Sequence, residues 1–374
     1  MTAGWRAGLV AVLLLLSGTS AASPCGAWPD WGTFARTFMS ADGRIVDPHS
    51  PRRHTVSEGQ AYALFFALVG NDRTRFDRLL QWTENNLSQG DLTRHLPAWH
   101  WGQADDGTWG VLDRNPASDA DLWIAYALAE AGRLWDERRY RVLSAVLARR
   151  ILDEEVAVLP GLGPTLLPAP VGFVSEEGWR LNPSYVPLML LRRLHDARPG
   201  QGWDALIESS LRINVEPAVH GFAPDWVLWR REGGFAPDAR SAAAGSYDAI
   251  RTYLWAGMLD AADPHRAALV EAFAPMLART RAAEGIPPER VDTRSGVAEN
   301  AGPFGFVAAL LPMAAAEPTL AQQMRRHVDQ ASARSPDHYY SQVLRLFGAG
   351  WHEQRYRFAP DGRVQPAWLR TCVR

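Results

Sequence analysis

The chain has 374 residues, of which 47% are hydrophobic and 21% are charged, and its formal net charge at pH 7 is −2. This composition indicates a packed globular protein. A nucleic-acid-binding surface usually needs a positive stripe, and the sequence contains no long basic run, so we expect no nucleic-acid partner.

The first 23 residues predict a secretory signal peptide. A single charge, Arg6, precedes the apolar run AGLVAVLLLL, and the small residues SGTSAAS follow as a place for cleavage. The apolar run is too short for a transmembrane helix, and no later stretch is long and apolar enough to span a bilayer. We therefore expect a mature chain of one domain, residues 24–374, that is periplasmic or secreted.

The two cysteines of the sequence, Cys25 and Cys372, lie at the two ends of this mature chain. In an oxidising compartment they predict a structural disulfide, and two free thiols are the alternative. Such a bridge would tie the ends of the domain together and would take no part in catalysis.

Apolar residues recur at helical spacing along the whole mature chain. Clear helices are predicted over 58–70, 73–87, 119–135, 138–155, 184–196, 247–259, 265–280 and 337–351, and weaker ones near 31–40, 203–213, 302–315 and 319–332. Strand signals are few: a hairpin within 226–238 that turns at Gly233–Gly234, and a short extended piece over 166–174. The pattern predicts an all-α domain in which antiparallel helix pairs close into a ring, with the loops at one end forming a cleft.

Two of the predicted helices begin with a capping-box pattern. Ser57 is followed three residues later by Gln60, and Ser118 is followed three residues later by Asp121. In such a box the two side chains satisfy the first free backbone N–H groups of the helix. We therefore predict structural roles for these four residues.

Three acids at helix starts are left without such a role: Glu58 in TVSEGQAY, Asp119 in PASDADLW and Asp248 in GSYDAIRT. Asp119 and Asp121 are two residues apart, so on a helix they point in roughly opposite directions, and Asp119 is free to face whatever lies beyond the helix end. Acids are common in first helical turns because the helix dipole favours them. Three of them in one ring would instead converge on one cleft.

Paired carboxylates are the chemistry that the sequence supports best. It contains no HExxH, CxxC, Gly-rich phosphate loop or GxSxG motif, and the DAD at 119–121 lacks a third acid nearby, so we expect no metal and no cofactor. Hydrolysis of a glycosidic bond needs one protonated acid and one ionised carboxylate. A helix dipole lowers a carboxyl pKa, which opposes a general acid, but Asp119 close to Glu58 would raise it again.

At these residues the sequence resembles glycoside hydrolase family 8 over essentially the whole mature chain. The motifs TVSEGQAYALFFALVG, LPAWHWG, ASDADLWIAYAL, WRLNPSYVP, PDWV and SYDAIRTYLWAGM occur in the order seen in the subgroup encoded with bacterial cellulose synthase. The resemblance implies an (α/α)6 barrel and an inverting endo-β-1,4-glucanase. It also implies a β-1,4-glucan as substrate and the cellulose synthase complex as a partner.

The resemblance assigns a role to each of the three acids. Glu58 would be the proton donor and Asp248 the general base that activates water. The family pattern labels Asp119 a nucleophile, but an inverting enzyme has no covalent nucleophile, so we interpret Asp119 as the residue that orients the sugar at the cleavage point and tunes Glu58.

Three further residues are candidates for binding the substrate. Trp101 in LPAWHWG and Tyr185 in NPSYVP suit sugar stacking or hydroxyl contacts, with ordinary core packing as the alternative. Arg251 lies one turn after Asp248 and would pair with it and keep it ionised, with a plain surface ion pair as the alternative.

Other functions remain open on the sequence alone. Another β-1,4-linked polymer, such as xylan or chitosan, is the nearest alternative substrate. A non-catalytic polysaccharide-binding partner of the synthase would need aromatic residues but not both Glu58 and Asp248, and a polysaccharide lyase would use Tyr, His or Arg instead. The inverting mechanism predicts a separation of about 6.5–9.5 Å between the carboxyls of Glu58 and Asp248, which leaves room for a water molecule.

Overall fold

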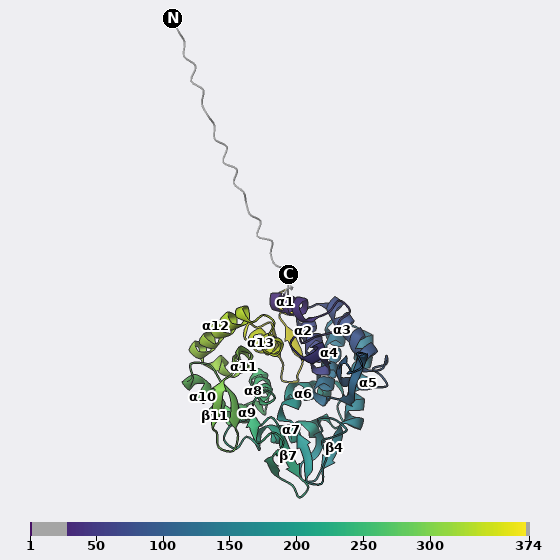
Figure 1. Ribbon diagram of the computed structural model, residues 1–374, viewed down its shortest axis with the longest axis vertical. Coiled ribbons are helices and arrows are strands. Elements are labelled where there is room, and N and C mark those ends of the chain that lie inside the picture. Colours follow the sequence, from purple (N-terminus) through teal and green to yellow (C-terminus); the bar gives the residue numbers. More distant parts are fainter. Residues whose placement is uncertain (2–27, 372–374) are drawn as a thin grey trace.

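Six inner helices form a ring that is surrounded by outer helices (Figure 1). The computed structural model describes Met1 and residues 28–371. The inner helices are α2 (Ser57–Val69), α4 (Ser118–Leu134), α6 (Leu188–Ala197), α8 (Ala249–Met258), α11 (Phe304–Leu310) and α13 (Tyr339–His352). The outer helices are α1 (Pro29–Phe38), α3 (Arg73–Leu87), α5 (Arg138–Glu154), α7 (Trp203–Val215), α9 (Arg266–Ala272), α10 (Ala274–Ala282) and α12 (Pro318–Arg334). This is the predicted (α/α)6 barrel.

The division into inner and outer helices follows from their sequences. In α2 every residue except Glu58 is buried, whereas α3 buries one face that includes Phe76 and Leu80 and exposes arginines on the other. A helix that is apolar on all sides lies inside a domain, and an amphipathic one covers its surface. Glu58 is thus a partly exposed acid in an otherwise buried helix.

Aromatic side chains fill the middle of the ring. The ring of Phe347 on α13 lies 5.7 Å from Phe65 on α2, 5.2 Å from Trp123 on α4 and 5.1 Å from Trp255 on α8, measured between ring centroids. Edge-to-face and offset contacts at these distances are favourable beyond the burial of area alone. The inner helices therefore enclose a packed core.

Short strands join the helices at both ends of the ring. They form five small antiparallel sheets: β1 (Thr55–Val56) with β2 (Ala98–Gln103) and β3 (Trp109–Pro116); β4 (Val156–Leu159) with β5 (Gly163–Leu166); β6 (Gly178–Leu181) with β7 (Val227–Arg230) and β8 (Phe235–Pro237); β9 (Ala244–Gly245) with β10 (Pro288–Asp292) and β11 (Ala298–Ala301); and β12 (Tyr356–Phe358) with β13 (Val364–Pro366). Three 3-10 turns, η1 (Pro51–Arg53), η2 (Pro183–Tyr185) and η3 (Met313–Ala316), and the short α14 (Trp368–Thr371) complete the elements.

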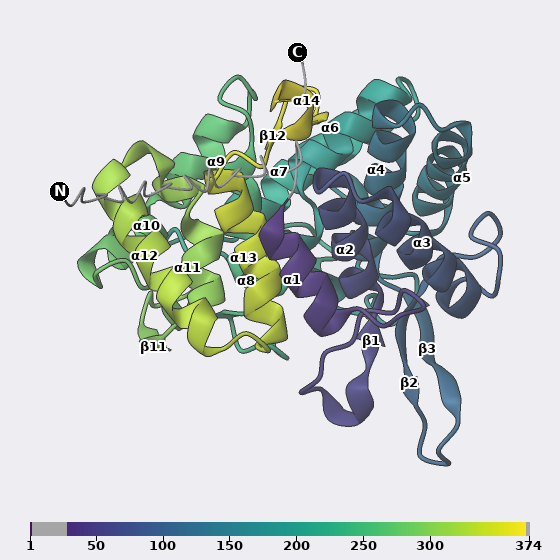
Figure 2. The same ribbon diagram turned by 90° about the horizontal axis from the view of Figure 1, so that it is seen from above.

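The two ends of the ring differ. Figure 2 shows β1, β2 and β3 projecting from one end, while β12 and α14 lie at the other. The strand β1 leads directly into α2, β3 into α4 and β9 towards α8, so these three inner helices begin at the end from which β1–β3 project. We call this end the open end, and the end covered by β12 and β13 the closed end.

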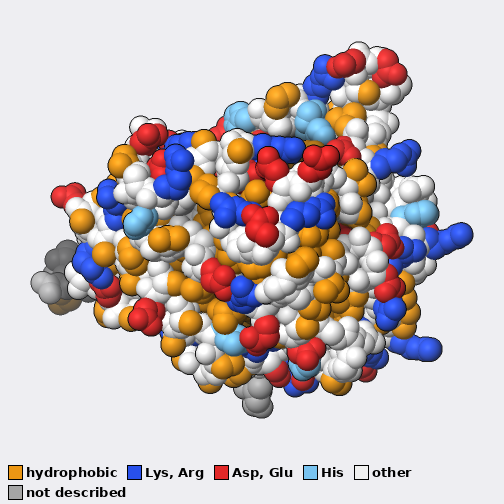
Figure 3. Space-filling view, turned by 90° about the horizontal axis from the view of Figure 1, so that it is seen from below, with side chains coloured by type: hydrophobic (Ala, Val, Ile, Leu, Met, Phe, Trp, Pro, Cys, Tyr) orange, Lys and Arg blue, Asp and Glu red, His pale blue; other side chains and the backbone are white. Residues whose placement is uncertain are grey.

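The surface carries charges of both signs. On the face drawn in Figure 3, basic and acidic side chains are interspersed, and neither sign gathers in one patch. No helix of the described residues has the length and apolar character needed to cross a membrane.

The predicted helices are all present, with shifted ends. The predicted helix over 265–280 is two helices, because the chain bends at Phe273 before Pro275. The predicted hairpin is confirmed as β7 and β8, with Gly233 and Gly234 in the left-handed region of the turn. The extended piece predicted over 166–174 is wrong between its two end residues: Leu166 ends β5, and Val174 forms an isolated β-bridge with Trp179. Both cysteines and the predicted signal peptide, apart from Met1, lie outside the described residues.

Candidate active site

The start of α2 is held in a different way from the one predicted. The capping box is wrong: α2 begins at Ser57, and its N-cap residue, Val56, makes no side-chain cap. The side chain of Gln60 reaches across to the segment before η1, where it accepts the N–H of Ile45 (2.6 Å) and donates to the carbonyl of Gly43 (3.1 Å). Gln60 therefore ties α2 to this segment and fixes the position of the helix start.

The start of α4 also lacks the predicted capping box. Its N-cap residue is Ala117, which provides no side-chain oxygen, and the hydroxyl of Ser118 has no hydrogen-bond partner. Asp119 is 1% exposed; one carboxyl oxygen accepts the N–H of Ala120 (2.8 Å), and the other has no partner. Asp121 is fully buried, and neither of its carboxyl oxygens has a hydrogen-bond partner. The one unpartnered oxygen of Asp119 is thus available to a ligand.

Asp248 at the start of α8 is held by two donors. Nη2 of Arg251 donates to one carboxyl oxygen (2.9 Å), and Nε1 of Trp226 donates to the other (3.0 Å). The side chain of Asp248 remains 31% exposed, whereas that of Arg251 is 8% exposed. The hydrogen bond from the guanidinium is charge-assisted, so it holds the carboxyl of Asp248 firmly in place.

Asp225 is a functional candidate that sequence reasoning missed. One of its carboxyl oxygens accepts the backbone N–H groups of Ser246 (2.8 Å), Asp248 (3.1 Å) and Ala249 (2.8 Å). It therefore caps α8 from a distant part of the chain, and its neighbour Trp226 binds the carboxylate of Asp248. The PDWV motif contains both residues, but no local pattern reveals that it meets the start of α8.

Arg251 lies among all three acids. Besides Asp248, it donates to Oγ of Ser184 (2.9 Å) in η2, and its guanidinium carbon lies 5.8 Å from the ring centroid of Tyr185. Its charge also acts on Glu58 and Asp119. The side chains of these acids therefore share one buried cation.

Burial sets the protonation of the two deeper acids. Burial raises the pKa of Glu58; the charge of Arg251 opposes this rise, and that of Asp248 adds to it. Burial, and then the charge of Glu58, raise the pKa of Asp119 well above its usual value. The site thus combines two carboxyls whose pKa values burial raises with a third, Asp248, that is paired with an arginine.

Of the two predicted aromatic contacts, Tyr185 lies beside the acids, whereas Trp101 contacts side chains on and around the β2–β3 hairpin. Tyr185 is subject to the charges of all three acids and packs against Trp226 (5.8 Å between centroids). Trp101 on β2 stacks on Trp109 (5.3 Å), with the guanidinium of Arg44 4.4 Å from its ring centroid. Trp109 is 49% exposed on the projecting β2–β3 hairpin.

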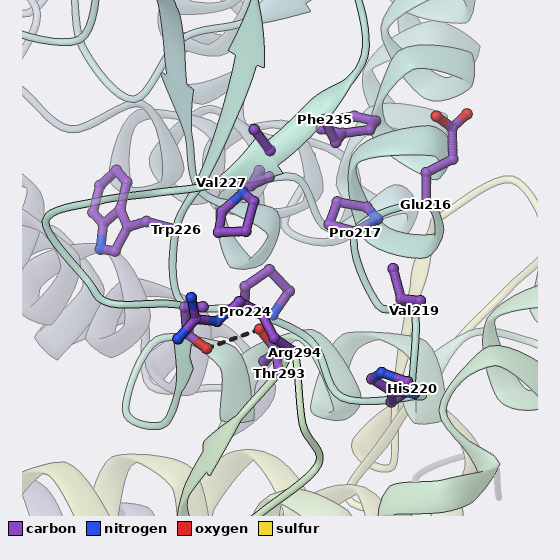
Figure 4. Close-up of a pocket in the computed structure, with 13 residues that line it drawn as sticks. Glu216, Pro217, Val219, His220, Pro224, Trp226, Val227, Phe235, Thr293 and Arg294 are labelled. Carbon is purple, nitrogen blue, oxygen red and sulfur yellow. Dashed lines mark hydrogen bonds between the residues drawn. The ribbon is translucent and has the colours of Figure 1, made fainter.

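A separate pocket of about 300 Å³ lies on the other side of Trp226 (Figure 4). In Figure 4 the indole of Trp226 points away from Phe235 and Val219, which line the pocket. None of the predicted site residues lines it. Among the described residues, no three His, Cys, Asp or Glu side chains are grouped so as to hold a metal ion.

Comparison with known proteins places this site in a family. The profile of Glycosyl hydrolases family 8 matches residues 5–354. The chain belongs to this family. A family 8 chain of this kind is a glycoside hydrolase.

Relatives match nearly the full length of this family 8 chain. An endoglucanase of Salmonella typhi is 45% identical over 100% of this chain and 98% of its own, and one of Xanthomonas axonopodis pv. citri is 48% identical over 98% and 96%. The crystal structure of an endo-1,4-D-glucanase from Vibrio fischeri ES114 superposes with a TM-score of 0.88 at 45% identity, and covers 91% of this chain and 99% of that one.

Proposed function

We propose that this family 8 enzyme is an inverting endo-β-1,4-glucanase in which Glu58 is the general acid and Asp248 the general base. The observation that carries this proposal is the contrast between the two acids. Burial raises the pKa of Glu58, which favours a protonated acid, whereas Asp248 accepts hydrogen bonds from Arg251 and Trp226 on its two carboxyl oxygens. An acid and a base with opposite environments are what glycosidic hydrolysis needs.

The reaction follows from these two roles. The carboxyl of Glu58 donates its proton to the glycosidic oxygen as the bond between that oxygen and the anomeric carbon breaks. A water molecule on the opposite face of the sugar gives one proton to Asp248, and its oxygen bonds to the anomeric carbon. The product that carries the attacked anomeric carbon leaves with inverted configuration, the other product leaves unchanged, and a proton returns from Asp248 to Glu58 before the next cycle.

Asp119 binds the sugar rather than attacking it. Its carboxyl is buried and has one oxygen without a partner, so it offers a hydrogen-bonding position deep in the site. A sugar hydroxyl would fill that position and would hold the ring against Glu58. Tyr185, which lies beside the same acids, would contact the same sugar.

Similarity to named enzymes supports glucan as the substrate. The relatives carry the name endoglucanase, and the Vibrio fischeri structure is that of an endo-1,4-D-glucanase. The subgroup motifs in the sequence support a role in cellulose synthesis and export, with the synthase complex as partner. On this proposal, the stacked Trp101 and Trp109 bind glucan units distant from the cleavage point.

The first test is the viscosity of carboxymethylcellulose together with proton NMR of the products. We expect the wild type to thin the polymer rapidly and to release the α-anomer first, and Glu58→Gln to do neither while remaining folded. Release of the β-anomer would overturn inversion. Activity on xylan or chitosan alone would replace the substrate, and binding without cleavage of any polymer would replace the enzyme with a binding protein.

We also propose that residues 1–23 are a signal peptide and that Cys25 and Cys372 form a disulfide. The intact mass of the exported protein tests both parts. We expect a chain that begins at residue 24 and gains the mass of two hydrogens on reduction. An unchanged mass after reduction would show two free thiols.

A further inference from the structure

The indole of Trp226, which donates to Asp248, lies against an arginine that the proposed reaction does not use. The guanidinium carbon of Arg180 is 3.8 Å from the centroid of the Trp226 ring. Nε1 of the same ring donates to a carboxyl oxygen of Asp248 (3.0 Å). A guanidinium at this distance is attracted by the face of an indole and restrains its plane. Arg180 is therefore connected to Asp248 through one intervening side chain.

The position of Arg180 follows from the three-stranded sheet of β6, β7 and β8. β7 is the middle strand, and Trp226 is the residue that precedes it. Arg180 on β6 pairs with Leu228, two residues after Trp226, so the side chains of Arg180 and Trp226 lie on the same face of the sheet. Asp238 directly follows β8, on the other side of β7. The side chain of Arg180 thus extends over the indole towards Asp238.

An ion pair holds Arg180 over the ring. Nε of Arg180 donates to one carboxyl oxygen of Asp238 (3.0 Å), and the other oxygen accepts the backbone N–H of Ser241 (2.8 Å). The side chain of Asp238 is 6% exposed and that of Arg180 is 20% exposed, so solvent ions screen the pair little. We call Arg180 and Asp238 the indole clamp, because their ion pair crosses from β6 to β8 over Trp226.

Two other rings also contact the indole. Phe173 stacks on Trp226 with 5.6 Å between centroids and an interplanar angle of 13°, and Tyr185 lies tilted against it at 5.8 Å. Neither ring carries a charge, and the guanidinium of Arg180 is closer to the indole centroid than either of them. The clamp is therefore the contact of Trp226 that combines a charge with an anchored partner.

The orientation of the indole matters for the carboxyl of Asp248. Arg251 donates to one of its oxygens and Trp226 to the other, while the backbone N–H of Asp248 donates to Asp225. The backbone contact fixes the start of α8 but not the side-chain torsions of Asp248. A tilt of the indole would therefore allow the carboxyl to turn about its bond to Arg251.

We propose that Arg180 is a positioning residue for the general base, and that the indole clamp holds Trp226 so that its N–H meets Asp248. The role of Asp248 as base rests on the proposed function, but the orientation of the N–H does not. When the charge over the ring is removed, the indole turns and the N–H leaves the carboxyl. Asp248 then holds the attacking water less well.

The orientation of the N–H is tested by the indole ¹⁵N–¹H spectrum of the enzyme without substrate. A hydrogen bond to a carboxyl moves an indole proton downfield, and Trp226→Phe identifies the resonance by its absence. In Arg180→Met we expect this resonance to move upfield and its proton to exchange faster with solvent. Arg180→Lys keeps a cation over the ring and should leave the resonance near its wild-type position. An unmoved resonance in Arg180→Met would overturn the proposal.

The effect on the reaction is tested by kcat and KM on a soluble glucan. We expect Arg180→Met to lower kcat about tenfold, as the loss of the N–H itself would, and to leave KM within about twofold. Arg180→Lys should lose less than about threefold. In Trp226→Phe, which has no N–H to orient, adding Arg180→Met should cost less than about twofold, because the two changes remove one interaction.

Arg231→Met is the matched control. The guanidinium carbon of the exposed Arg231 lies 4.7 Å from the ring centroid of Trp179, so this change removes the same kind of contact from the same sheet. Trp179 precedes Arg180 on β6 and points to the other face of the sheet. We expect kcat and the Trp226 resonance to stay unchanged. Arg180→Gln is the second variant in case Arg180→Met does not fold, because it removes the charge and keeps a donor for Asp238.

Two kinetic outcomes would overturn the positioning role. Losses of kcat that multiply in the double variant of Arg180 and Trp226 would show that the two residues act independently. A raised KM with unchanged kcat in Arg180→Met would instead place Arg180 against the glucan, since it also lines a cavity of about 490 Å³. A wild type without glucanase activity would overturn the proposed function alone, because the indole spectrum needs no substrate.

Discussion

The two ends of the barrel differ in how many cationic partners surround each acidic side chain. At the open end, the side chains of Glu58, Asp119 and Asp248 share Arg251. At the closed end, Glu130 on α4 is 0% exposed and accepts from two arginines, Arg133 (2.5 Å) and Arg193 (2.5 Å), and from the backbone N–H of Val364 (2.7 Å). At the open end one arginine lies among three acids, whereas at the closed end one acid accepts from two arginines.

This difference separates a site for proton transfer from a structural anchor. A buried acid with several donors keeps its charge and contributes by holding segments together. Burial raises the pKa of Glu58 and of Asp119, so these carboxyls hold a proton more readily than a free carboxyl does. Burial with few donors therefore distinguishes these two acids from the anchor at Glu130.

The largest expected effect is on activity. It is measured by making the same Glu→Gln substitution at each end of the barrel. Glu58→Gln removes the proton donor, and we expect kcat to fall by about 10²–10⁴-fold. Glu130→Gln should leave kcat within about twofold, since Glu130 lies at the other end. Initial rates on a soluble glucan check both. Comparable losses of kcat in the two variants would contradict the functional difference between the two ends.

The next largest effect is on stability, and here we expect the substitution at the closed end to be the harmful one. Glu130→Ala leaves the buried Arg193 without this partner, and we expect the free energy of unfolding to fall by about 3–5 kcal/mol. Glu58→Gln should be at least as stable as the wild type at pH 8, because burial raises the pKa of Glu58 and its ionisation therefore costs stability as pH rises. Urea unfolding of both variants measures the contrast.

Arg251→Met tests how the shared cation affects the pKa values of the acids at the open end. Arg251 lowers the pKa values of Glu58 and Asp119, so its removal should raise both. We expect kcat to fall about 10²-fold as Asp248 loses its ion pair, and the alkaline limb of the pH profile to move to higher pH, because Glu58 stays protonated longer. Arg251→Lys keeps the charge and should leave the limb in place. A limb that moves to lower pH in Arg251→Met would contradict the assignment.

The smallest effect is expected for Trp226→Phe. This change keeps an aromatic ring against Tyr185 and removes only the N–H donor to Asp248. A hydrogen bond to a charged group contributes about 1.5–3 kcal/mol, so we expect a loss of kcat/KM of about tenfold or somewhat more. Equal kcat/KM values for variant and wild type would mean that Arg251 alone holds the base.

The sequence predicted the ring well because its inner helices are apolar on all sides and its outer helices on one. It failed for the short strands: β2 and β3 are largely exposed or half-buried, and β12 and β13 have three residues each, so they carry little periodicity. These strands form because the ends of the ring provide partners, which a local pattern does not reveal.

The prediction of Glu58 started from a capping box at the start of α2, and the structure does not contain that box. Gln60 holds Ile45 instead of capping α2, yet Glu58 remains conspicuous as the charged residue in the run EGQAYALFFALV. Asp225 was missed for a different reason. It acts on a helix start more than twenty residues away in sequence, through contacts that only the folded chain creates.

The anchor at Glu130 has a consequence for the order of synthesis. The N–H of Val364 that Glu130 accepts lies 234 residues further along the chain, and the carbonyl of Gly362 accepts the hydroxyl of Tyr126 across a similar interval. A ribosome has therefore completed all six inner helices before it adds the segment that closes the barrel. A nascent chain shorter than this carries a partly satisfied charge in its core, so the final folding step waits for translation to pass residue 364.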